Sequence, residues 1–262
     1  MKVTVQWIAD LMDAWAPQET AESWDNTGLL VGDMRREARR VLTALDAGEA
    51  VLGEAVRGGY DLLVVHHPLM YTPINKITAD DPLGKKLLTL IENKIGLFAA
   101  HTNLDVAEGG TNDMLFDLLG LTAKEPFDGC AGCAGLLQKP VALSELALHL
   151  KNLLNLPYIN FSGRPEKLLR KAGVCAGDAS NPRYGRAALS LGCDVYITGD
   201  MRYHNAQEII ETGLAVIDVT HYASEIPIAR AMAARINAEA KKTGADLAAE
   251  YSAADARVFI TK

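Results

Sequence analysis

Three apolar segments of this chain run directly into histidine, and two of them reach a carboxylate four residues later. The side chains concerned are His66 and His67, His101 and Asp105, and His221 and Glu225. Imidazole nitrogens and carboxylate oxygens are common ligands of divalent transition metals. Because ligands bind at the carboxyl ends of strands in open α/β sheets, the pattern predicts a metal site at such an edge.

The pair His66 and His67 is informative because adjacent residues in a strand point to opposite faces. Both rings can reach one site only where the strand has ended and the backbone turns. Pro68 favours such an ending, because it cannot donate to a strand ladder and restricts His67 to extended conformations. The alternative is two unrelated loop histidines.

The other two pairs have the spacing of one helical turn. A single turn after His101 would bring Asp105 to the same side, and His221 and Glu225 have the i, i+4 spacing of one helix face. Asp105 is expected to be a ligand, whereas His101 either orients a ligand or binds substrate. The alternatives are a turn aspartate at 105 and, for Glu225, a carboxylate at a helix start stabilised by the helix dipole.

The number of candidate ligands exceeds what one metal ion needs. A single zinc with an open position takes three protein ligands, but the set His66, His67, Asp105, His221 and Glu225 suits two ions that share a bridging carboxylate and water. Two divalent cations outweigh two carboxylates and a hydroxide by one positive charge. The filled site is therefore expected to attract a small anion such as phosphate.

Alternating strands and helices predict the scaffold, an α/β fold of two lobes in which mixed sheets are flanked by helices. Strands are expected at 39–45, 61–66, 95–100, 168–176, 194–198, 214–218 and 256–260. Helices are expected at 4–15, 47–57, 83–93, 111–119, 144–154, 183–191, 206–211 and 225–242. The pattern weakens at 122–140, which places the boundary between an N-terminal lobe (1–125) and a C-terminal lobe (126–262).

Bulk composition limits the partners. The formal net charge of -7 argues against a nucleic-acid-coating surface. No apolar run reaches the roughly 20 residues of a membrane span, and the first residues lack the apolar core of a signal peptide. We therefore expect a cytoplasmic protein that does not bind a membrane.

The four cysteines are expected to be reduced in that compartment. Cys130 and Cys133 form a lone C-x-x-C in a glycine-rich stretch. The pair is either half a zinc site, a redox pair or a small-residue turn, and the turn is the favoured interpretation.

Five ordered motifs resemble the Nif-three-like family, which is also known as GTP cyclohydrolase 1 type 2. They are Glu22-Ser-Trp-Asp-Asn-Thr-Gly-Leu-Leu-Val-Gly32, Val65-His-His-Pro68, His101-Thr-Asn-Leu-Asp105, Tyr196-Ile-Thr-Gly-Asp-Met-Arg-Tyr-His204 and His221-Tyr-Ala-Ser-Glu225. The resemblance spans nearly the whole chain. The chain departs from it at 129–135, where Gly-Cys-Ala-Gly replaces the family's usual Gly-Arg-x-Gly turn.

The resemblance implies two α/β lobes with a dinuclear metal site between them. The family's ligands map onto His66, His67, Asp105, His221 and Glu225, and His101 and His204 fall in matching motifs. It also implies assembly into ring-shaped hexamers. Zn, Mn, Fe and Ni all suit mixed nitrogen and oxygen ligands, so the metal is left open.

Two smaller features of these motifs remain open. Residues 24–28 are interpreted as a turn that leads into a strand at 29–31, with Trp24 or Asn26 lining a pocket as the alternative. Asp46 ends a strand, where it either orients a ligand or caps the next helix.

Two functions remain open. The first is a dinuclear-metal hydrolase that opens the ring of a purine nucleotide such as GTP, or a phosphoesterase, with His101 or His204 moving the proton. No Walker A loop occurs in the sequence, so nucleotide binding would depend on the metals and the pocket. The second is a non-catalytic protein that stores, senses or transfers metal or binds a partner.

Overall fold

The chain divides into two compact units in a computed structural model that describes residues 1–255 and 257–259. Met1–Glu108 and Ile228–Val258 form the first unit, and Gly109–Pro227 forms the body of the second. This division differs from the expected boundary at 125, because the chain returns to the first sheet after residue 227. The strand β11 (Ala248–Tyr251) pairs in parallel with β2 (Arg40–Ala44).

The first unit is built on a five-stranded sheet in the order β1-β4-β3-β2-β11. Its remaining strands are β1 (Gly28–Val31), β3 (Leu62–Val65) and β4 (Gly96–Ala99). Only β1 runs antiparallel to its neighbour. Every residue of β3 and β4 is buried, as expected for parallel strands that helices cover on both faces.

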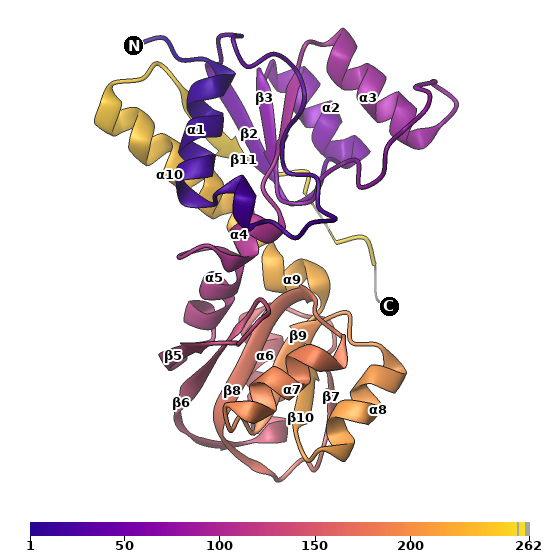
Figure 1. Cartoon of the computed structure of the whole chain (residues 1–262), viewed down its shortest axis with the longest axis vertical. Helices are drawn as coiled ribbons and strands as arrows, with labels where there is room; N and C mark the ends of the chain where they lie inside the picture. The colour runs from indigo at the N-terminus through magenta and orange to yellow at the C-terminus, as the bar shows by residue number, and fades with distance from the viewer. Residues whose placement is uncertain (256, 260–262) are drawn as a thin grey trace. The chain divides into compact units, whose positions relative to one another are not determined.

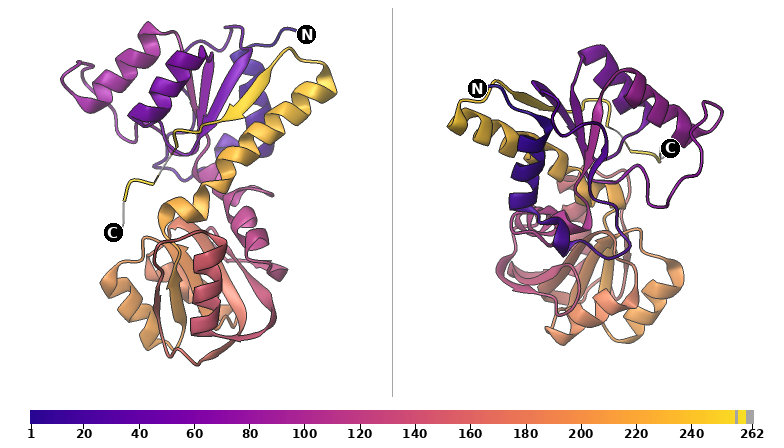
Figure 2. Two further views of the ribbon diagram at one scale, coloured as in Figure 1. Left: turned by 180° about the vertical axis from the view of Figure 1, so that it is seen from behind. Right: turned by 45° about the horizontal axis from the view of Figure 1, so that its top comes forward.

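Helices lie on both faces of that sheet (Figures 1 and 2). The helices of this unit are α1 (Val5–Trp15), η1 (Gln18–Thr20), α2 (Glu49–Gly58), α3 (Pro82–Glu92), α4 (Thr102–Val106) and α10 (Pro227–Thr243). One core cluster joins Leu42, Leu63 and Leu97 of the strands to Val51 and Leu52 of α2.

The second unit has a six-stranded mixed sheet in the order β5-β6-β8-β9-β10-β7. The strands are β5 (Thr122–Pro126), β6 (Cys133–Ala142), β7 (Asn160–Ser162), β8 (Leu168–Asp178), β9 (Val195–Gly199) and β10 (Ala215–Asp218). The central three, β8, β9 and β10, are parallel, and the outer three run antiparallel to their neighbours.

Helices cover both faces of this sheet as well (Figure 2). They are α5 (Thr111–Leu118), α6 (Leu143–Leu153), α7 (Pro182–Ser190), α8 (Tyr203–Glu211) and α9 (His221–Glu225). Alternation along β9 divides the core. Val195 and Ile197 join a cluster with α5 and α6, whereas Tyr196 joins a second cluster with α7 and α8.

The expected α/β class is confirmed, and most of the expected helices and strands are present. The expected strand at 256–260 is not: residues 257–259 are not in a strand, and 256 and 260 lie outside the described residues. The weak pattern at 122–140 contains β5 and β6. All five residues of β5 are exposed at a sheet edge, so it carries no apolar alternation.

The four cysteines are free thiols in the second unit. Cys130 and Cys133 flank a turn in which Gly129 and Gly132 have positive φ. Burial raises the pKa of Cys133 to about 12, so its sulfur is protonated at neutral pH. A neutral buried thiol is a poor nucleophile, and the positive φ of the two glycines supports the interpretation of a small-residue turn.

Glu54 of α2 fastens the segment after β11 to the first unit. Its carboxylate accepts hydrogen bonds from Ser252 Oγ at 2.5 Å, Ala253 N at 3.2 Å and Ala254 N at 3.0 Å. Burial by itself would raise the pKa of Glu54, but these donors favour the charged form and hold the pKa below its ordinary value.

Glu54→Gln should therefore lower the free energy of unfolding at pH 7 by about 1 kcal/mol, a modest loss because solvent screens the group. A carboxyl with a depressed folded pKa stabilises the fold above its unfolded pKa and loses that effect as the pH falls through the folded value. The difference between variant and wild type should shrink below pH 4.5, and urea denaturation at several pH values measures it. A difference that stays constant down to pH 3 would contradict this origin.

Candidate metal centre

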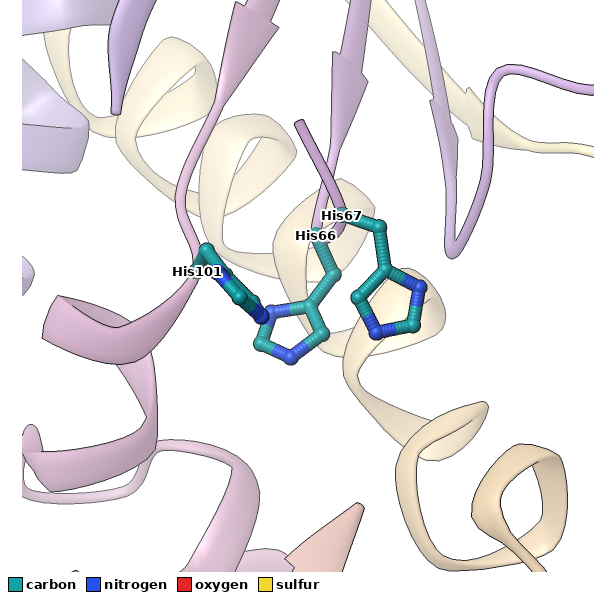
Figure 3. A group of neighbouring side chains, drawn as sticks. All are labelled: His66, His67 and His101. Atoms are coloured by element: carbon teal, nitrogen blue, oxygen red, sulfur yellow. The ribbon is translucent and has the colours of Figure 1, made fainter. Parts of the chain in front are cut away.

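Three histidines gather where β3 and β4 end in the first unit (Figure 3). The ring centroids of His66 and His67 are 5.0 Å apart, and that of His101 lies 5.2 Å from His66 and 5.4 Å from His67. One ring nitrogen from each lies within 4.8 Å of the others, so the three together could hold a metal ion.

The two adjacent histidines converge as expected, because β3 ends at Val65, just before them. The backbone nitrogens of His66 and His67 still donate to the oxygens of Ala44 and Leu45, at 3.2 and 2.9 Å. The backbone is therefore held against the neighbouring chain while it leaves the strand. Figure 3 shows both rings on the same side of it.

Asp105 joins the histidines through the short helix α4. Leu104 N and Asp105 N donate to His101 O at 2.8 and 3.0 Å, which closes the expected single turn. Asp105 Oδ1 lies 3.5 Å from Nε2 of the fully buried His66. The carboxylate of Asp105 therefore lies beside the imidazole of His66.

The Nδ1 atoms of His66 and His67 each lie within hydrogen-bond distance of an oxygen atom. His66 Nδ1 lies 2.8 Å from Ala100 O, and His67 Nδ1 lies 3.0 Å from Asp46 Oδ1. A carbonyl oxygen can only accept, so Nδ1 of His66 carries a proton, and in the neutral ring Nε2 has the lone pair. The same hydrogen-bonding pattern orients metal-bound histidines in general.

The sequence left two roles for Asp46, orienting a ligand and capping a helix. The N-cap of α2 is Gly48, which has no side chain, whereas Asp46 contacts His67. The orienting role is therefore the one that the structure supports.

His101 is oriented by Asp25, a residue that the sequence did not single out. The Asp25 side chain is fully buried and accepts from His101 Nδ1 at 2.9 Å and from Thr102 N at 3.0 Å. Thr102 Oγ donates to it as well, at 2.5 Å. Burial would raise the pKa of Asp25, but these hydrogen bonds and the His101 ring hold the pKa well below its ordinary value. Asp25 is thus a permanent anion that fixes the His101 ring.

In the second unit, His221 and Glu225 lie on one face of α9 as expected. His221 Nε2 and Glu225 Oε2 are 2.9 Å apart, and Glu225 is buried. His221 Nδ1 lies 3.0 Å from Asp200 Oδ2. Asp200 is a second orienting carboxylate that sequence reasoning missed, although it stands in the motif 196–204.

The backbone around this pair is strained. Asp200, which follows β9, has φ 49°, and Thr220, which precedes α9, has φ 68°. Such conformations cost residues with a side chain about 1–3 kcal/mol and concentrate at functional sites. Gly177 on β8 also has positive φ, 70°, and a Cβ there would fall on the Glu225 carboxylate. Strand β8 therefore approaches the carboxylate as closely as only glycine allows.

His204 lies at the start of α8, exposed, with its ring edge-on to Tyr203 at 5.2 Å. Among the described residues, the groups that could hold a metal do not include it. A catalytic role for His204 stays a prediction.

A cavity of about 430 Å³ opens beside His67 in the first unit. Its charged lining residues are Asp46, Glu49, Lys86 and Asp255. Burial raises the pKa of Asp255 to about 6. Carboxyls outnumber the one lysine, so this cavity does not supply a basic phosphate site.

Both units thus belong to one structural class: layered α/β folds with imidazoles and carboxylates gathered after parallel strands. In the first unit the three histidines could hold a metal ion. Along the described residues, no helix has the length and apolarity needed to cross a membrane.

The chain belongs to the Duf34/NIF3 (NGG1p interacting factor 3) family, whose sequence model matches residues 3–256. This confirms the resemblance drawn from the five motifs. The chain is 35% identical over 258 residues to a protein of Streptomyces coelicolor named GTP cyclohydrolase 1 type 2 homolog. The match covers 94% of this chain and 90% of that protein. A Clostridium perfringens protein of the same name is 34% identical over 228 residues, covering 84% and 86%.

The fold is also that of a solved relative. The crystal structure of a Bacillus cereus protein related to NIF3 superposes with a TM-score of 0.94 at 23% identity, covering 100% of this chain and 99% of that one. At this identity the likeness concerns the fold.

Proposed function

We propose that the protein binds two divalent metal ions and is a metal-dependent hydrolase. The ligands would be His66, His67 and Asp105 of the first unit and His221 and Glu225 of the second. The observation that carries the proposal is the orientation of the histidines. Each has its Nδ1 next to an oxygen atom, and this orientation turns Nε2 of His66 toward Asp105 and Nε2 of His221 toward Glu225.

Two divalent ions held by these residues would supply water activated near neutral pH. The chain's own residues would provide the rest. His101, fixed through Nδ1 by Asp25, has its Nε2 available to take and return a proton. His204 is the second candidate for this role.

The reaction that we propose is the hydrolytic opening of a purine nucleotide ring. The oxygen of water adds to C8, one ring C–N bond breaks, and the released nitrogen takes a proton. The names of the relatives, GTP cyclohydrolase 1 type 2 homolog, make GTP the first substrate to test. Divalent ions bound at the site would themselves attract the phosphate groups.

The test is turnover. Metal-loaded protein is incubated with GTP, and mass spectrometry follows the gain of one water. Asp105→Ala should lose the activity, because it removes a ligand, whereas Asp117→Ala, an exposed aspartate of α5, should retain it. Turnover that survives Asp105→Ala would exclude the metal site as the catalyst. Tight metal binding with no turnover on GTP, phosphodiesters or damaged nucleotides would instead favour metal storage or sensing.

A further inference from the structure

Two large aromatic side chains stand exposed beside the histidine group of the first unit. Trp24 is 57% exposed and Tyr71 is 47% exposed. Both rings contact His101 edge-on, with centroids at 5.9 and 5.8 Å and interplanar angles of 75° and 72°. His101 lies next to His66 and His67. Its ring therefore stands between the two aromatic rings and these candidate ligands.

The loops that carry these rings are hydrogen-bonded to each other and to His101. Asn26 Nδ2 donates to Met70 O at 2.7 Å, which ties the Trp24 loop to the Tyr71 loop. Asp25, next to Trp24, binds His101 and Thr102. The two loops are therefore held together before any ligand arrives, which lowers the entropic cost of binding.

Neither ring contributes its full burial energy to the fold. Trp15, by contrast, is 8% exposed, and its indole nitrogen donates to Glu108 O. An indole left half open to water beside a reactive centre gains most from a flat apolar partner. Stacking of a base on an aromatic side chain is favourable for every base, because each has a π-face.

We propose that Trp24 and Tyr71 form an aromatic subsite that stacks a planar nitrogen heterocycle, the base of a nucleotide, beside the metal centre. The inference rests on the proposed function for the reaction that follows. The binding itself needs only the rings, which places the reacting base, rather than the phosphates, on the His101 side of the site.

Calorimetry with guanosine on the metal-loaded protein tests this, since guanosine has a base and no phosphate. Wild type should bind it, and ribose 5-phosphate should not reproduce the binding. Trp24→Leu and Tyr71→Leu should each weaken guanosine binding about 5- to 150-fold, the range expected for loss of one stacking partner. Trp24→Phe should restore most of the affinity, because a flat face returns.

Tyr158→Leu is the matched control, because Tyr158 is a tyrosine 41% exposed that lies outside these loops. It should bind guanosine as wild type does, and thermal melting checks that all variants fold. Equal guanosine affinity in wild type and Trp24→Leu would overturn the subsite. Guanosine binding without GTP turnover would contradict the proposed hydrolase and support the subsite. GTP turnover with an unchanged KM in Trp24→Leu would support the hydrolase and contradict the subsite.

Discussion

His66→Asn is expected to weaken the binding of divalent metal by more than about 100-fold, the upper range for losing a residue that merely orients a ligand. The asparagine Nδ2 takes the place of the histidine Nδ1 and can still donate to Ala100 O, the bond that holds the ring in wild type. What disappears is Nε2, the atom next to Asp105. The substitution therefore removes the metal-binding atom and keeps the hydrogen bond that stabilises the fold. Titration with Zn²⁺ or Mn²⁺ by calorimetry measures the change.

Metal-dependent stability gives a second readout. With metal at 100 times its dissociation constant, binding stabilises the folded state by about 2.7 kcal/mol. A 100-fold weaker site would retain about 0.4 kcal/mol of that at the same concentration. His149→Asn is the matched control, because His149 is an exposed histidine of α6. If His66→Asn and His149→Asn bound metal equally well, His66 would not be a ligand.

The sequence was sufficient to single out the candidate ligands that follow a strand. His66, His101 and His221 each come just after an apolar run, and period-2 strands and one-turn spacings fix where their neighbours Asp105 and Glu225 point. These relations are local, and the structure within each unit agrees with them.

The residues that orient the rings were harder to find. Asp25 reaches His101 across 76 positions in the chain, and Asp200 reaches His221 across 21. Nothing in the local pattern distinguishes such an aspartate from a turn residue, because the hydrogen bond exists only after the sheet has assembled. The motifs 22–32 and 196–204 contained both residues without indicating their partners.

Non-local pairing also explains the differences in the fold. The strand β11 is short and mostly exposed, and it forms because β2 offers it an open edge. Its pairing brings α10 into the first unit, so a division by position along the chain could not reproduce the division in space.

The histidine and carboxylate groups of the two units share one arrangement. In the first unit, Asp46, His67 and His101 follow β2, β3 and β4, three adjacent parallel strands. In the second, Asp200 and His221 follow β9 and β10, and Gly177 lies near the end of the adjacent β8. Parallel neighbours bring their carboxyl ends to the same edge, so each sheet gathers reactive side chains that are remote in sequence.

Gly177→Ala should disturb the proposed metal ligand Glu225 as well as the stability of the fold. The residue has φ 70°, where an alanine costs about 1–2 kcal/mol. The added methyl would also fall on the Glu225 carboxylate. That carboxylate is enclosed, because Gly177 N donates to Ser224 Oγ at 3.0 Å and holds β8 against α9. We therefore expect Glu225 to be displaced and metal affinity to fall at least about 10-fold, as for a perturbed ligand.

Gly192→Ala separates the two effects. Gly192 has φ 74°, and a Cβ there would meet nothing within 4 Å. It should lose a similar 1–2 kcal/mol through backbone strain alone and keep its metal affinity. Urea denaturation measures the first quantity in chelator, and calorimetric metal titration measures the second. Should both variants bind metal equally, the position of Glu225 would not matter to the ions, and Glu225 would leave the proposed ligand set.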